Sequence, residues 1–299
     1  MRSVIGLPLL FISSLVVAEQ VDYSLADFAA DQAMRSFIYL DYYRASDGSN
    51  YRGLNLDYAL NFDSRLSLGI GQSRAPQGAV NRQNIDARNI DSWNAGFFSY
   101  SGDSFNYALD YEHWSAQGGA ISDTFSFSAG YDGLDWGMYV TPELRYIDLY
   151  SRRLANGSRR LFEVKGTGLT AGLRYYGWSG WTIGVSASGY SYDRDISVIN
   201  RVLVQRFLSS DALALAYSFL NSKVSAELDY DFSGDFSGTR LGFEMNQAVV
   251  EGDNSLIKGE VVKLGFYQFD PVLLDLEAGR YRYSEQSVNY TRLSLTFAW

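Results

Sequence analysis

The chain has 299 residues, no cysteine and a formal net charge of −9, so it has neither disulfide bonds nor cysteine-ligated metal sites. The acidic balance also argues against a nucleic-acid partner, because binding to phosphates requires concentrated positive charge. Aromatic residues make up 16% of the chain while the mean hydropathy is −0.15, a combination typical of a sheet with one apolar and one polar face.

The first residues have the pattern of an export signal. Arg2 precedes an apolar run over 4–17, and the small residue Ala18 is followed by Glu19. We therefore predict a signal peptide at 1–18, Sec-dependent export, and an acidic periplasmic lead-in at 19–34. No later apolar run is long enough for a membrane-spanning helix, so a mature chain located in a membrane would have to form a closed barrel.

From residue 35 onward, apolar and polar residues alternate with the period of a β-strand. Leu54, Leu56 and Tyr58 fall on one face of a candidate strand, and Asn55 and Asp57 fall on the other. Fifteen candidate strands follow from this pattern: 35–44, 51–62, 65–73, 90–100, 104–115, 120–131, 134–151, 159–176, 181–194, 203–220, 222–232, 239–249, 257–269, 272–283 and 288–299.

A barrel with both ends of the chain on one side of the membrane needs an even number of strands, so one assignment must be wrong. Reading 222–249 as one long strand interrupted by FSGDFSG gives fourteen strands, whereas an additional strand at 195–207 gives sixteen. We predict an all-β fold for 35–299, a transmembrane antiparallel up-and-down β-barrel of about 14 strands, with 12–16 possible.

The last strand, RLSLTFAW, places Leu293, Leu295, Phe297 and Trp299 on one face. With the signal peptide, this ending resembles that of Gram-negative bacterial outer-membrane β-barrel proteins, in particular porin-like ones. The resemblance implies that these four residues form a membrane insertion signal read by the barrel-assembly machinery. It also implies location in the outer membrane, with membrane lipid and lipopolysaccharide as partners. Such proteins usually end in Phe, so Trp299 is a departure from the pattern.

Charged residues on the polar face of the strands are candidates for a pore lining. Residues 19–143 contain 17 acidic and 7 basic residues, 145–206 contain 4 and 10, and 207–299 contain 13 and 7. A basic arc facing acidic arcs would select solutes by charge; alternatively, the charges lie in loops and on a merely solvated face. The predicted pore-lining residues are Asp57, Asp110, Glu112, Arg145, Arg174, Glu227, Asp229, Lys263 and Arg292.

The only histidine suggests a second possibility, an enzyme. If the strands around it form a hairpin about Gly118, His113 lies opposite Asp123 on the lipid-facing side, with Ser115 two residues along. A base oriented by an acid and next to a hydroxyl is an arrangement that activates a nucleophile. The position resembles that of the His and Ser of outer-membrane phospholipases and lipid A deacylases. The simpler interpretation is a solvated histidine at the rim.

Taken together, the pattern predicts a monomeric outer-membrane channel for passive diffusion of small hydrophilic solutes, with no cofactor and no metal. The alternatives are a lipid esterase or deacylase that uses His113, Ser115 and Asp123, and a structural or adhesive barrel without transport.

Overall fold

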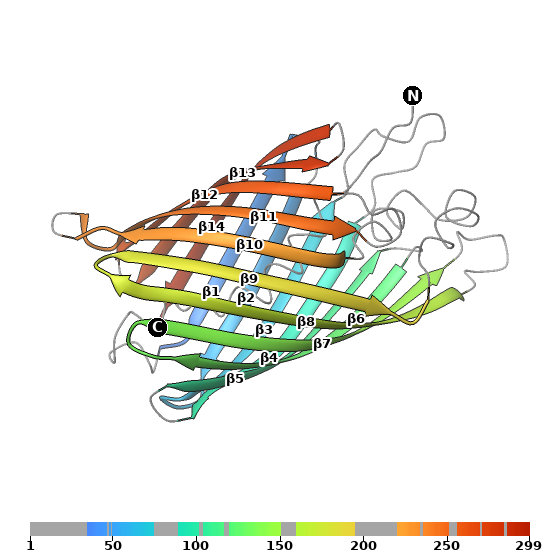
Figure 1. Cartoon of the computed structure of the whole chain (residues 1–299), viewed down its shortest axis with the longest axis horizontal. Coiled ribbons are helices and arrows are strands. Elements are labelled where there is room, and N and C mark those ends of the chain that lie inside the picture. The colour runs from blue at the N-terminus through green and yellow to red at the C-terminus, as the bar shows by residue number, and fades with distance from the viewer. Residues whose placement is uncertain are drawn as a thin grey trace.

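The structure, a computed structural model, describes residues 35–299 except 47, 49, 75–88, 102–103, 117–119, 151–159, 195–219, 234–235, 251–255, 270 and 284–285. The predicted signal peptide at 1–18 and lead-in at 19–34 lie outside the described residues. The described chain forms one closed barrel of fourteen strands (Figure 1).

The strands are long and follow one another around the barrel in chain order. They are β1 (Phe37–Ala45), β2 (Asn50–Ala59), β3 (Ser64–Arg74), β4 (Asn89–Ser101), β5 (Phe105–Ala116), β6 (Ala120–Asp132), β7 (Trp136–Tyr150), β8 (Arg160–Trp178), β9 (Trp181–Tyr192), β10 (Leu220–Asp231), β11 (Thr239–Val250), β12 (Leu256–Phe269), β13 (Val272–Tyr283) and β14 (Gln286–Ala298).

Every strand pairs antiparallel with its neighbours, and β14 closes the barrel against β1. The seam is continuous, from Phe37 opposite Ala298 to Ala45 opposite Tyr290. At one end of the seam the backbone N–H of Ser36 donates to the carbonyl of Trp299 at 2.9 Å. Closure matters because an open sheet edge inside a lipid bilayer would leave backbone N–H and C=O groups without partners.

The predicted barrel of about 14 strands is confirmed, but the merger that led to this number is wrong. Residues 222–249 are two strands, β10 and β11, joined by a tight connection in which Gly238 has a φ of 79°. A residue with a side chain is strained in that left-handed region, so the glycine favours a turn over a continuous strand. The predicted strand at 203–220 lies outside the described residues except for Leu220, which begins β10, and β9 pairs directly with β10.

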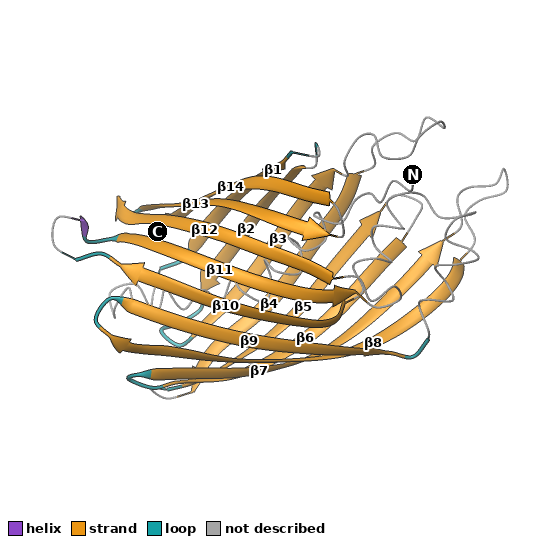
Figure 2. Ribbon diagram, turned by 45° about the horizontal axis from the view of Figure 1, so that its top comes forward, coloured by secondary structure: helices purple, strands orange, loops and turns teal. Residues whose placement is uncertain are grey.

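The connections divide the barrel into two ends (Figure 2). The turns after β2, β4, β6, β8, β10 and β12 are short, and both ends of the barrel chain lie with them. The longest connections in sequence follow β3, β7 and β9, at the opposite end. We call these the short-turn end and the long-connection end.

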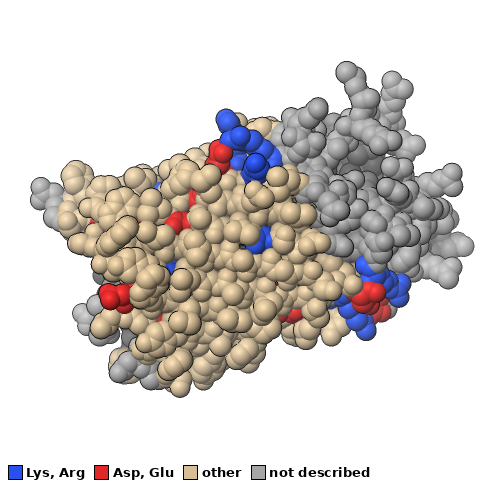
Figure 3. All heavy atoms as spheres, viewed as in Figure 1, with Lys and Arg blue, Asp and Glu red and all other residues tan. Residues whose placement is uncertain are grey.

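The two faces of the sheet differ in chemistry. Leu40, Leu54 and Ile70 are neighbours across β1, β2 and β3, and all three are exposed on the outside of the barrel. Figure 3 shows an outer wall that is largely free of charged atoms between its two ends. Within the described residues, no helix is long and apolar enough to cross a membrane. The exposed apolar belt is the surface that a transmembrane barrel presents to lipid.

Candidate functional site in the barrel lumen

The inner face of the barrel carries the nine predicted pore-lining residues. The strand registers place each of them on the face opposite the exposed apolar belt, on β2, β5, β7, β8, β10, β12 and β14. Asp57 alternates with Leu56, Asp110 with Leu109, and Arg292 with Leu293, so one period-two pattern places all of them.

Basic side chains of the inner face pair with acidic neighbours on the same wall. Arg174 Nε on β8 donates to Glu227 Oε1 on β10 at 2.8 Å. Gly184 on β9 lies between them in the register, and a Cβ there would lie 2.3 Å from Glu227 Oε1. The missing side chain lets an ion pair span three strands. Arg145 likewise donates to Glu143 on its own strand at 2.6 Å.

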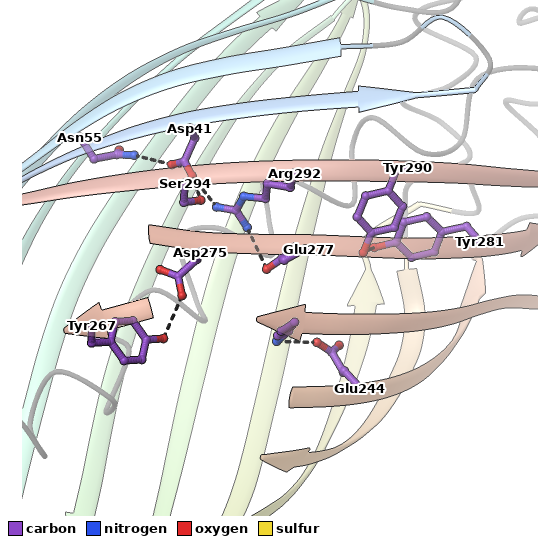
Figure 4. Close-up of polar contacts among 11 residues, drawn as sticks. Asp41, Asn55, Glu244, Tyr267, Asp275, Glu277, Tyr281, Tyr290, Arg292 and Ser294 are labelled. Carbon is purple, nitrogen blue, oxygen red and sulfur yellow. Dashed lines mark hydrogen bonds and ion pairs between the residues drawn. The ribbon is translucent and has the colours of Figure 1, made fainter. Parts of the chain in front are cut away.

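The densest polar network lies at the seam (Figure 4). Arg292 on β14 donates from Nη2 to Asp41 Oδ1 on β1 at 3.0 Å, and its Nη1 lies 3.7 Å from Glu277 Oε1 on β13. Ser294 Oγ and Asn55 Nδ2 also donate to the carboxylate of Asp41. The Asp41 side chain is 0% exposed, so this network holds a buried carboxylate across the line where the barrel closes.

Further pairs continue along the same wall. Lys263 Nζ lies 2.9 Å from Glu244 Oε2, and Arg240 binds Asp231 through two hydrogen bonds, of 2.6 and 2.8 Å. The predicted basic arc is therefore absent from the described strands: the inward arginines at positions 145 and 174 are each matched by a carboxylate. Counting acidic and basic residues along the chain could not reveal these ion pairs, because the pairing depends on which strands become neighbours in the barrel.

Two carboxylates on the opposite wall differ from the rest. Within the described residues, neither Asp110 nor Glu112 on β5 has a hydrogen-bond or ion-pair partner, whereas Asp57 on β2 accepts a hydrogen bond from Tyr39 at 2.9 Å. Acidic residues outnumber basic ones, twelve to seven, on the described inner face. The acidic ones are Asp41, Asp57, Asp110, Glu112, Asp132, Glu143, Glu227, Asp229, Asp231, Glu244, Asp275 and Glu277, and the basic ones are Arg65, Arg145, Arg174, Lys223, Arg240, Lys263 and Arg292.

A group of tyrosines that was not predicted from the sequence packs on the inner face near the long-connection end. Tyr43, Tyr51, Tyr281 and Tyr290 are buried together with apolar residues of β10, β11 and β12. The rings of Tyr281 and Tyr290 stack with their centroids 5.0 Å apart (Figure 4). The inward positions of these tyrosines were readable from the alternation, since each lies two residues from another inward residue. Their mutual packing was not, because it joins strands from both ends of the chain.

The predicted histidine cluster forms in part, on the outer face. His113 on β5 lies directly opposite Asp123 on β6, and His113 Nδ1 is 2.8 Å from Asp123 Oδ1. Tyr111 donates its hydroxyl to the same oxygen at 2.5 Å, and the Trp93 ring stacks on the imidazole at 5.7 Å. Ser115 lies on the same face two residues further along, and among the described residues it forms no hydrogen bond with His113.

The four residues of the predicted insertion signal lie at the short-turn end. Phe297 and Trp299 are 47% and 55% exposed, and Leu293 and Leu295 continue the same outward row along β14. The row is part of the apolar belt, and its role in insertion stays a prediction.

Comparison with known proteins identifies solved structures with a similar fold. No protein-family model matches the sequence, and a search of curated proteins finds no relative. Among solved structures, a CymD monoaromatic hydrocarbon channel superposes with a TM-score of 0.54 at 9% identity, covering 88% of this chain and 87% of that one. A loop L8 deletion mutant of OmpT, an outer membrane protein of Vibrio cholerae, gives a TM-score of 0.47 at 12% identity, covering 89% and 98%. The KdgM porin gives 0.40 at 11% identity, covering 88% and 99%.

At these identities the likeness concerns the fold alone. It agrees with the two features already described, a closed up-and-down barrel and an apolar outer belt around a polar inner face. In such barrels the short turns face the periplasm and the longer connections face outward. The chain therefore has a closed fourteen-stranded β-barrel fold similar to that of the CymD channel.

Proposed function

We propose that the barrel is an outer-membrane channel through which small hydrophilic solutes diffuse passively. The observation that carries the proposal is the chemistry of the barrel wall: its described inner face bears twelve acidic and seven basic side chains, and its outer face is apolar. A barrel of this strand number is wide enough for water, unlike one of eight strands, which side chains fill. Water-filled lumens lined by charge are the usual route for polar solutes.

The same inner face favours cationic over anionic solutes. Five of its basic residues are neutralised by ion pairs: Arg145, Arg174, Arg240, Lys263 and Arg292. Asp110 and Glu112 form no ion pair within the described residues, although Arg145 acts on Glu112 electrostatically, and the excess of acidic side chains gives the described inner face a net negative potential. The superposed CymD structure is described as a monoaromatic hydrocarbon channel, a solute class for which the charged inner face here offers no evident advantage.

Neutralising the two unpaired carboxylates is expected to weaken the cation preference. In planar bilayers under a salt gradient, Asp110→Asn and Glu112→Gln should each lower the cation-to-anion permeability ratio by about two- to fourfold. This corresponds to a Coulomb energy of about 0.5–0.8 kcal/mol at 5–8 Å in water. Asp91→Asn is the matched control, because Asp91 lies on the adjacent strand β4 but faces outward, where Gln72 donates to it at 3.0 Å.

A folded wild-type barrel that gives no conductance would overturn the channel proposal. Wild-type conductance with an unchanged permeability ratio in Asp110→Asn and Glu112→Gln would overturn only the cation preference.

The contact between His113 and Asp123 favours a second candidate, a lipid esterase at the outer rim. The pair has the geometry of a base oriented by an acid. Ser115, the candidate nucleophile, is not hydrogen-bonded to this pair: among the described residues it donates no hydrogen bond to the imidazole of His113. A side-chain rotation would be required before Ser115 is activated.

Ser115→Ala provides the test of this second candidate. If the esterase exists, purified barrel hydrolyses acyl chains of phospholipid or lipid A in mixed micelles, and Ser115→Ala loses at least about 100-fold of that rate, as expected when a nucleophile is removed. Ser287→Ala, on the outer face of β14, is the matched control. An equal rate in Ser115→Ala, or no hydrolysis by the wild type, removes the esterase.

A further inference from the structure

The outer face changes character where the apolar belt ends toward the long-connection end. On β1 the outward row runs Leu40, Tyr42, Arg44, and on β2 it runs Leu54, Arg52. Both arginines are exposed. Cations therefore follow directly after the lipid-facing leucines, at the level where a bilayer changes from acyl chains to headgroups.

The adjoining strands extend this basic surface. Lys258 on β12 lies opposite Arg282 on β13, and Arg280 lies two residues further along β13; all three are exposed. The surface is continuous across the seam, because Arg280 Nε donates to Asn289 Oδ1 at 2.8 Å and the carbonyl of Asn289 accepts from Ser46, at the end of β1. Figure 3 shows basic side chains gathered at the upper edge of the barrel, at the border with the residues drawn grey.

We call Arg44, Arg52, Lys258, Arg280 and Arg282 the basic sector. Within the described part of these strands and turns, one carboxylate accompanies them, Glu260, which accepts from Arg282 Nη2 at 2.5 Å. Within the described residues, Arg44, Arg52 and Lys258 have no acidic partner. Among the described residues, five exposed cations thus face a single anion.

Where the structure describes the rest of the circumference, the outward residues have the opposite balance. Where the apolar belt ends on β4, β6, β7 and β8, the outward residues include Asp91, Asp123, Asp148 and Glu163. Lys165, on β8, lies 3.6 Å from Glu163. In Figure 3 the lower right edge accordingly shows blue and red atoms together. Among the described outward residues at this level, the cations are therefore concentrated on one side of the barrel.

We propose that the basic sector is a docking surface for the phosphate-bearing headgroup of lipopolysaccharide in the outer leaflet. Arginine presents a planar fork of N–H donors that matches phosphate oxygens, and four of the five cations are arginines. The exposed leucines directly below, Leu40, Leu54 and Leu276, offer the apolar surface that the acyl chains of the same molecule require.

The position of the basic sector next to the apolar belt favours a phosphate-bearing lipid over a soluble anionic ligand. A soluble anionic protein or free phosphate gains nothing from the apolar belt beneath the basic sector, whereas a lipid that carries phosphates uses both surfaces at once. Cationic side chains at a membrane surface contribute about a fivefold gain in affinity for anionic lipid each. The inference stands independently of transport, because no residue of the basic sector faces the lumen.

The experiment is a titration of the folded, mature barrel in detergent micelles with diphosphoryl lipid A, read by native mass spectrometry. Wild type is expected to bind it more tightly than lipid A stripped of both phosphates. The variant Arg44→Gln/Arg52→Gln/Arg280→Gln/Arg282→Gln is expected to bind at least about 100-fold more weakly, following the loss of about fivefold per cation. Lys165→Gln, which removes an outward cation on the opposite side, is expected to bind like wild type.

Heat-modifiable migration on gels reports whether each variant is folded, and bilayer conductance separates this proposal from the channel. The double variants Arg44→Gln/Arg52→Gln and Arg280→Gln/Arg282→Gln, each expected to lose about 25-fold, give the answer if the quadruple variant does not fold. Wild-type affinity in these variants, or equal binding of phosphorylated and dephosphorylated lipid A by the wild type, overturns the proposal whatever the conductance.

Discussion

Replacing Arg292 by methionine is expected to lower the free energy of unfolding by about 3–5 kcal/mol, the usual cost of breaking a buried ion pair from one side. Arg292 is 14% exposed and is the only basic residue within ion-pair distance of Asp41 among the described residues. Its loss leaves that fully buried carboxylate with only Ser294 and Asn55 as hydrogen-bond donors, and leaves Glu277 without its cation. Urea unfolding of the barrel in lipid vesicles measures the change.

Two comparisons isolate the cause. Lys165→Met removes a cation that is 56% exposed and should change the unfolding free energy by less than about 1 kcal/mol. The triple variant Arg292→Met/Asp41→Asn/Glu277→Gln removes all the charges together and should recover most of the loss, because no buried carboxylate remains unpaired. If Arg292→Met unfolds like the wild type, the seam does not depend on this network.

Leu68→Arg is expected to cost about 2–4 kcal/mol of stability in vesicles, as arginine does on the lipid-facing side near the middle of a barrel wall. Leu68 lies in the middle of β3, is 56% exposed, and has Leu56 on β2 and Ala95 on β4 as its outward neighbours. A guanidinium there must leave water or distort the bilayer.

The preceding residue provides a control on the same strand. Ser67 faces the lumen, where a Cβ on Gly96 would lie close to both Ser67 Oγ and Asp110 Oδ1. Ser67→Arg therefore places its cation in a polar, acidic surrounding and should change stability by less than about 1 kcal/mol. If the two variants were reversed in their effects, the assignment of inner and outer faces would be wrong.

The strands could be predicted because apolar and polar residues alternate along their whole length. β13 occupies Val272–Tyr283, the residues that alternation predicted, and β9 and β12 differ from prediction by two residues or fewer at each end. Alternation also found β10 and β11 as the separate candidates 222–232 and 239–249; the error was their merger across FSGDFSG to reach an even number, which the turn at Gly238 rules out.

The candidate site was predictable residue by residue but not contact by contact. The inward positions of Arg174 and Glu227 follow from period two, whereas their ion pair follows from the absence of a side chain at Gly184 on the strand between them. His113 and Asp123 are the exception: a single hairpin joins them, so counting from Gly118 was sufficient to place them opposite each other. Contacts within a hairpin can be read from the sequence, and contacts that skip a strand cannot.

The seam also constrains how this protein reaches its final state. Arg292 and Asp41 are separated by 251 positions along the chain, and the contact between them exists only when the last strand meets the first. Pairing of such distant segments is slow, because the chain loses much conformational entropy before any contact forms. The sealed cylinder therefore appears only in a late step of folding, after both ends of the chain have been brought together.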